Sequence, residues 1–211
     1  PILLLGVVSI ALGAQAHEYW IEPLEYRLTP ADPLEADLRV GTDFSGSQQA
    51  YLPNNFNSFN VTDASGTRPI EGRLGDMPAA NIVTEAEGLH ILNLFSSSQR
   101  LTGESFEEFP DFVNMHGMEW VVARHAERGL PDTDFREAYT RFAKSLVAVG
   151  DGAGEDRYIG MIFELVAGQN PYTDDMTSGM PITVLFGGKP LPDKQVDLFY
   201  RNTSGALTRL S

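Results

Sequence analysis

The residue with the clearest potential for chemistry is His17, which directly follows the stretch 13–16, Gly-Ala-Gln-Ala. Ala14 and Ala16 match the small-residue pattern of a signal-peptide cleavage site, and the apolar run 2–12 precedes them. Cleavage after Ala16 would make His17 the first residue of the mature protein, with a free α-amine beside its imidazole. Both nitrogens lose their protons near neutral pH, so together they can chelate a divalent transition metal. Alternatively, His17 is simply the residue that follows the cleavage site.

Further ligands of such a site must be histidine, methionine, carboxylate or backbone groups, because the sequence contains no cysteine. His90 and His116 are the candidates for completing a nitrogen-rich site, and Glu18 could add a carboxylate beside His17. His90 has a competing interpretation. Alternation over 89–95 places it on one strand face with leucines, where a histidine is more often a hydrogen-bonded core residue than a ligand.

The cluster 114–118, Asn-Met-His-Gly-Met, places His116 among thioethers that suit a soft or borderline metal such as copper or nickel. The alternative is that the methionines fill a core, while His116 is a surface histidine at a helix C-terminus, where the helix dipole favours imidazolium. His125 follows Arg124 and precedes Arg128, whose charges disfavour a bound cation. We therefore expect His125 to be exposed on the surface.

Recognised catalytic patterns are missing from the sequence. It contains no G-x-S-x-G, H-E-x-x-H or phosphate-binding P-loop motif. An N-terminal histidine with a second histidine is also the arrangement of copper monooxygenases that attack polysaccharides, but no partner histidine with a flat aromatic substrate face is evident. Glu107 and Glu108 are better explained as charges at a helix N-terminus than as an acid–base pair. We therefore expect a protein that is not an enzyme.

The composition indicates a globular protein, and the start of the sequence indicates that it is exported. The 211 residues carry a formal net charge of −14 with scattered basic residues, which argues against nucleic acid as a partner. An acidic surface concentrates cations, as a metal scavenger requires, but it also simply keeps secreted proteins in solution. The run 2–12 is too short for a membrane anchor and is typical of a signal peptide. Because the basic start of such a peptide is missing before it, we expect the sequence to be incomplete at this end.

Alternating apolar and polar residues predict β-strands before residue 100. This pattern is found within 26–44 and over 89–95. The stretches 56–61 and 68–73 flank the turn sequence 63–66, Asp-Ala-Ser-Gly, and together predict a hairpin. The first part of the chain is therefore expected to form a β-sheet structure with one buried face.

The hydrophobic period changes after residue 100. Ser105 and Glu108 form a capping-box pattern that predicts a helix over 105–116, a second helix is predicted over 118–128, and a glycine closes each. Apolar residues at i, i+3 and i+4 spacing predict a third helix over 132–150. Its apolar stripe consists of Phe135, Ala138, Tyr139, Phe142, Ala143 and Leu146.

The rest of the chain returns to β-structure. We expect a strand over 159–166 that rejoins the first sheet, and a linker over 169–180, which is rich in Asp, Thr, Ser, Gly and Pro. The alternating stretches 181–186 and 195–200 predict the first strands of a second β unit, whose partners would lie beyond Ser211.

These patterns predict a mainly β protein with a defined domain organisation. A signal peptide covers 1–16, and a β-sandwich domain covers 17–168 with a helical insertion at about 105–149. A linker over 169–180 then leads to the start of a second β module at 181–211.

Three stretches together resemble the bacterial family called domain of unknown function 4198. They are 16–23, Ala-His-Glu-Tyr-Trp-Ile-Glu-Pro; 136–146, Arg-Glu-Ala-Tyr-Thr-Arg-Phe-Ala-Lys-Ser-Leu; and 188–192, Gly-Lys-Pro-Leu-Pro. The resemblance runs from His17 to the end of the chain, and the family is linked with periplasmic nickel and cobalt uptake. It implies a β-sandwich interrupted by helices, followed by an immunoglobulin-like or carboxypeptidase-regulatory-like module. The cluster 114–118 departs from the family pattern, in which acidic residues are expected there.

The function that follows is an exported periplasmic protein that binds nickel or cobalt, or copper as a further option, and assists metal uptake. The metal ligands predicted are His17, Glu18, His90 and His116. The partners implied are the metal ion and a membrane metal-uptake transporter, and the oligomeric state stays open. The alternative is a non-catalytic β-sandwich module that binds a protein or glycan at the cell surface. Such a module does not need the free amine of His17.

Overall fold

The computed structural model describes residues 17–104, 109–133, 135–202 and 204–210. The predicted signal peptide at 1–16 and the predicted capping residues Ser105 and Glu108 lie outside the described residues. The chain divides into two compact units. The helical unit contains Leu101–Glu137, and the β unit contains His17–Arg100 together with Ala138–Ser211.

The first sheet of the β unit is built around a long strand, β3 (Pro33–Thr42). Strand β1 (Glu18–Pro23) pairs with it in antiparallel fashion, with Glu18 opposite Gly41 and Pro23 opposite Ala36. Two further strands pair with β3 in antiparallel fashion. Strand β4 (Ser45–Gln49) pairs with its second half, and β7 (Ala80–Val83) pairs with its first half.

The second sheet has the strand order β2-β11-β8-β5-β6. Its centre is β8 (Gly88–Ser96), which pairs with β5 (Phe56–Asp63) on one side and β11 (Phe142–Val149) on the other, both antiparallel. The edge strands are β2 (Arg27–Leu28), parallel to β11, and β6 (Gly66–Pro69), which closes a hairpin with β5. The hairpin predicted from the turn at 63–66 is therefore confirmed.

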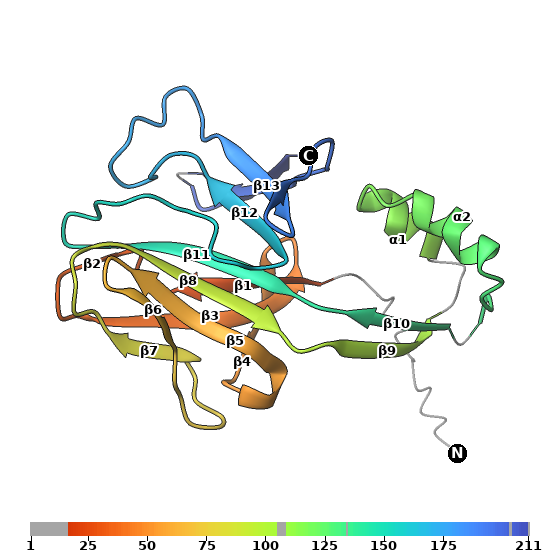
Figure 1. The fold of residues 1–211 in the computed structure, drawn as a ribbon, viewed down its shortest axis with the longest axis horizontal. Helices are drawn as coiled ribbons and strands as arrows, with labels where there is room; N and C mark the ends of the chain where they lie inside the picture. The colour runs from red at the N-terminus through yellow and green to blue at the C-terminus, as the bar shows by residue number, and fades with distance from the viewer. Residues whose placement is uncertain (1–16, 105–108, 134, 203, 211) are drawn as a thin grey trace, which may run out of the picture. The chain divides into compact units, whose positions relative to one another are not determined.

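The two sheets lie against each other as two layers and enclose one apolar core (Figure 1). Leu34 and Leu38 of β3 face Leu92 and Leu94 of β8, and all four side chains are fully buried. The fold is therefore mainly β, a β-sandwich with a helical insertion, as predicted. Burial of this apolar face is the main term that holds the sheets together, at roughly 25 cal/mol for each Å² removed from water. Its buried members are Ile21, Leu34, Ala36, Leu38, Tyr51, Phe59, Val61, Ile70, Ala79, Ala80, Leu92, Leu94, Ala143 and Val147.

The helical unit contains α1 (Phe109–Met115) and α2 (Trp120–Glu127), which agree with two of the predicted helices. Gly117 and Gly129 follow them with φ of 63° and 61°, values that a residue without a Cβ adopts at little cost. The amide of Met118 donates to the carbonyl of Val113 at 2.7 Å and closes the end of α1. No helix in the described part of the chain is long and apolar enough to cross a membrane.

The third predicted helix, over 132–150, is wrong. The stretch forms β10 (Phe135–Tyr139), which pairs with β9 (Gln99–Glu104), and then β11, which lies between β2 and β8 in the second sheet. Apolar residues do recur here at helical spacing, but they form strands in the structure. Eight consecutive residues of β11 pair with β8, from Phe142 opposite Phe95 to Val149 opposite Gly88. This long-range pairing outweighs a weak local helix preference.

The C-terminal part of the β unit forms two small sheets. In one, β13 (Ile182–Phe186) pairs with β12 (Phe163–Ala167) and with β14 (Lys189–Pro190). In the other, β15 (Leu198–Arg201) pairs with β16 (Leu207–Leu210). The prediction that 159–166 rejoins the first sheet is wrong, because the strand there, β12, takes β13 as its partner.

The connection predicted as a linker, 169–180, is tied to the sandwich by specific hydrogen bonds. Asn170 is buried and its amide donates to the carbonyls of Gly152 at 2.8 Å and Gly154 at 2.9 Å. The Tyr172 hydroxyl donates to the carbonyl of Leu146 at 2.5 Å. The 3-10 helix η1 (Pro53–Asn55) joins β4 to β5 and completes the described elements.

Candidate functional site

His17 is exposed and lies immediately before β1. The next residue, Glu18, is the first of the strand and pairs with Gly41 of β3, so the backbone after His17 is fixed by the sheet. The Glu18 Oε2 atom is buried and has no hydrogen-bond partner among the described residues. A buried carboxylate oxygen without a partner is costly, so this atom favours a cation or donor close to it.

Alternation along β1 sends its side chains to opposite faces of the first sheet. Tyr19 and Ile21 face the apolar core. Trp20 lies on the other face, where its ring stacks on Phe44 at a centroid distance of 4.7 Å, and Phe44 in turn stacks on Phe199 at 5.0 Å. The short stretch after His17 therefore packs through aromatic side chains on both sides, which fixes the position of its backbone.

His90 is fully buried in β8, as expected of a core histidine. Its Nδ1 lies 3.3 Å from the carbonyl oxygen of Gly88, and its Nε2 lies 3.4 Å from Asp63 Oδ2. Asp63 is also buried and accepts a hydrogen bond from Arg68. Burial lowers the His90 pKa below its usual value and outweighs the Gly88 hydrogen bond and the Asp63 charge, which act to raise it.

The lowered pKa of His90 predicts a specific pH dependence of stability. Below about pH 6.5 an unfolded chain protonates this histidine, whereas the folded chain keeps it neutral until the pH reaches its lower pKa. The unfolded state then binds more protons, so the free energy of unfolding should fall as the pH decreases through this window. Urea unfolding at about pH 7.5 and about pH 5.5 measures the effect, and His90→Gln should give a smaller difference between the two values. Equal differences in both proteins would contradict the assignment.

The other two histidines lie in the helical unit. His116 follows α1 and is partly buried. The surface position expected for His125 is wrong, since only 6% of this residue is exposed. Its Nε2 lies 3.0 Å from the carbonyl oxygen of Pro131, and its ring contacts that of Phe109. His125 is therefore a core residue of this unit. The charges of Arg124 and Arg128 beside it in the sequence gave no information about its burial.

The described residues contain no group of three or more His, Asp or Glu side chains that could together hold a metal ion. The buried pair of His90 and Asp63 is consequently not joined by His17 or Glu18. The metal-ligand roles of His17, Glu18, His90 and His116 remain predictions.

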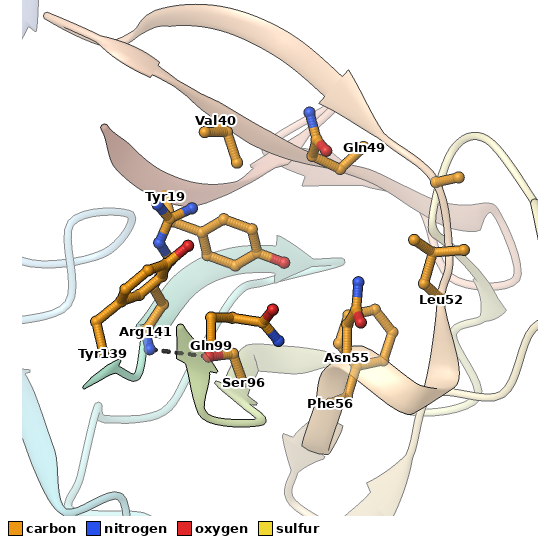
Figure 2. A pocket seen from close by; sticks show the side chains of 11 residues that line it. Tyr19, Val40, Gln49, Leu52, Asn55, Phe56, Ser96, Gln99, Tyr139 and Arg141 are labelled. Atoms are coloured by element: carbon orange, nitrogen blue, oxygen red, sulfur yellow. Dashed lines mark hydrogen bonds between the residues drawn. The ribbon is translucent and has the colours of Figure 1, made fainter. Parts of the chain in front are cut away.

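A pocket of about 160 Å³ is lined by residues of the two sandwich sheets together with Gln99 of β9 and Tyr139 of β10 (Figure 2). Tyr19, Asn55 and Gln99 direct their side chains into the same space. No acidic residue is found among the described residues that line it. The complete lining is Tyr19, Val40, Gln49, Ala50, Leu52, Asn55, Phe56, Ser96, Gln99, Tyr139 and Arg141.

Arg141 supplies the positive charge of this pocket. Its guanidinium carbon lies 4.9 Å from the ring centre of Tyr139 and 5.5 Å from that of Tyr19. Its backbone is fixed by Ser96, because the Arg141 amide donates to Ser96 Oγ at 2.9 Å and the Arg141 carbonyl accepts from the Ser96 amide at 2.9 Å. Burial raises the pKa of Tyr19 to about 12 although the Arg141 charge opposes this, so its hydroxyl stays protonated at neutral pH.

Comparison with known proteins identifies the family. The family described as "Domain of unknown function (DUF4198)" matches residues 14–209. The chain belongs to the DUF4198 family. No curated protein and no solved structure matches this DUF4198 protein. The resemblance noted in the stretches 16–23, 136–146 and 188–192 is therefore confirmed over nearly the whole chain.

Sequence reasoning missed the pocket of the DUF4198 protein. Tyr19 lies in one of the stretches that carry the family resemblance, and Tyr139 and Arg141 lie in another. In the helix predicted over 132–150, Tyr139 and Arg141 would lie on different faces, so the prediction gave no reason to expect both in one pocket. The one local signal was an arginine between aromatic residues, in the run 139–142, Tyr-Thr-Arg-Phe.

Proposed function

We propose that this DUF4198 protein is an exported periplasmic protein that binds a divalent transition metal through an N-terminal chelate at His17 and passes it to a membrane uptake transporter. The observation that carries the proposal is the buried, unpartnered Oε2 atom of Glu18, next to the exposed His17. The link of the family with nickel and cobalt uptake supports the same metals here, with copper as a further option.

The two residues offer suitable donors for such a metal. After cleavage behind Ala16, His17 would supply an α-amine and an imidazole nitrogen, which nickel, cobalt and copper all accept. Glu18 would supply a carboxylate oxygen or neutralise the charge of the bound ion. The pairing of β1 with β3 holds this backbone before a metal arrives, which lowers the ordering entropy lost on binding. His90 and His116 are not required by this proposal.

Calorimetric titration with nickel, cobalt and copper tests the chelate. The protein that begins at His17 should bind at least one of these metals, and a variant with one glycine placed before His17 should bind it about 100-fold more weakly, a loss of about 2.7 kcal/mol. Glu18→Gln should also weaken binding, whereas Glu25→Gln, which changes an exposed carboxylate of the same unit, serves as the matched control. Equal affinity with and without the added glycine would exclude the chelate.

The pocket at Arg141 favours a second candidate function, a non-catalytic binding module. This function needs neither the amine nor the imidazole of His17. If no version of the protein binds a metal in the titration, the binding module becomes the better explanation of this fold.

A further inference from the structure

We propose that the pocket at Arg141 binds a small hydroxylated organic acid, with the guanidinium of Arg141 pairing with its carboxylate. The pocket belongs entirely to the β unit and has its own donors, acceptors and apolar wall. The proposal is independent of the metal chelate, because no lining residue is one of the predicted metal ligands.

Charge pairing distinguishes Arg141 from three other arginines of the β unit. Arg39, Arg68 and Arg209 each form an ion pair with a carboxylate. Among the described residues, the side-chain partners of Arg141 are instead the rings of Tyr19 and Tyr139. In a chain with a net charge of −14, an arginine in a pocket without a carboxylate leaves its fork of N–H donors available to an anion.

The polar groups around Arg141 favour a ligand that carries hydroxyl groups as well as a carboxylate. The protonated Tyr19 hydroxyl, which points toward Asn55 and Gln99 in Figure 2, can donate to a ligand oxygen. The amide nitrogens of Gln49 and Gln99 already donate to Ser47 Oγ and Ser97 Oγ, each at 2.9 Å. Both amides also carry an oxygen that can accept from a ligand hydroxyl, and Gln99 keeps a second N–H that can donate to one.

Size and shape limit the ligand further. The volume of about 160 Å³ resembles that of a cavity of roughly 150 Å³ that holds one benzene molecule. A six-membered ring fits such a space, with substituents that reach the opening. Val40, Leu52 and Phe56 provide the apolar wall against which the carbon skeleton would pack. A sugar acid with a single pyranose ring meets these requirements.

Nuclear magnetic resonance titration of the ¹⁵N-labelled full chain, in a metal-free buffer without carboxylates, tests the proposal. The probes are D-galacturonate, D-galactose, which lacks the carboxylate, and tri-alanine, which carries a carboxylate on a peptide. We expect saturable binding of galacturonate with a Kd of about 1 mM or tighter, and binding of galactose and tri-alanine at least about 10-fold weaker. Shifts should be centred on Tyr19, Gln99 and Arg141.

Variants assign this binding to the guanidinium. Arg141→Gln should weaken galacturonate binding at least about 10-fold. The matched control is Arg27→Gln, which removes an arginine that also lies over a tyrosine ring, 5.0 Å from the centre of Tyr172, outside the pocket. Tyr19→Phe removes only the hydroxyl and should weaken binding about 3- to 10-fold, so it tests the pocket even if Arg141→Gln does not fold.

Several results would overturn the proposal. They are the lack of saturable galacturonate binding up to about 20 mM, equal binding of galactose, or an affinity that neither Arg141→Gln nor Tyr19→Phe reduces. Tighter binding of tri-alanine than of galacturonate would assign the pocket to a peptide terminus instead. Because the titration contains no metal, failure of the His17 chelate would not change any of these outcomes.

Discussion

Replacing Lys144 by methionine should lower the free energy of unfolding of this DUF4198 protein by about 3–5 kcal/mol. The Lys144 ammonium lies 2.6 Å from Asp156 Oδ1 and 2.8 Å from Glu164 Oε1. The side chains are 9%, 3% and 0% exposed, respectively. Methionine keeps the packing of the stem but leaves two buried carboxylates without their counter-charge, and this causes the expected loss.

The position of this ion cluster explains why its loss should affect the whole β unit. Lys144 lies on β11 of the sandwich, whereas Glu164 lies on β12 of the C-terminal sheet. Lys144 also donates to the carbonyl of Arg157 at 2.9 Å. Backbone amides of Ile159 and Met161 donate to Glu164 at 3.0 and 3.1 Å, and these hydrogen bonds reduce the cost of the unpaired buried carboxylate without cancelling it.

Urea unfolding of the wild type and Lys144→Met measures the difference. Lys189→Met is the matched control, because Lys189 is exposed in β14 and its replacement should change stability by no more than about 0.5 kcal/mol. A triple variant with Asp156→Asn and Glu164→Gln in addition removes the unpaired charges and should recover part of the loss. A change below about 1 kcal/mol in Lys144→Met would show that the cluster is not a buried ion pair in solution.

Replacing Leu92 by alanine should lower the free energy of unfolding by about 3–5 kcal/mol. Leu92 lies in the middle of β8, pairs with Val61 of β5 and Ser145 of β11, and is fully buried between the two sheets. The substitution loses the transfer free energy of the deleted atoms and leaves a cavity that two paired neighbours prevent from collapsing. Thermal or urea unfolding at neutral pH gives the value.

The matched control for this substitution is Leu74→Ala. Leu74 is 75% exposed, so the identical chemical change removes almost no buried surface and should alter stability by no more than about 0.5 kcal/mol. A similar loss for both variants would mean that the destabilisation reflects general sensitivity of the chain. In that case Leu92 would not belong to a packed sandwich core.

Local signals in the sequence were sufficient for much of this fold. The alternation over 89–95 correctly predicted strand β8 and the buried face that His90 shares with Leu92 and Leu94. The turn at 63–66 correctly predicted the hairpin of β5 and β6, and glycines marked the ends of α1 and α2. These features follow from conformational preferences of neighbouring residues, so a single sequence contains the information.

The sequence by itself therefore determined the mainly β class and the family. Only the tertiary structure decided that 135–139 and 142–149 are strands, because their partners β9 and β8 are distant in the sequence. The same limit applies to the partners of buried groups. Asp63 beside His90, the carboxylates around Lys144, and the Tyr19 ring beside Arg141 come together only when separate parts of the chain fold against each other. No local periodicity specifies which residues will meet in this way.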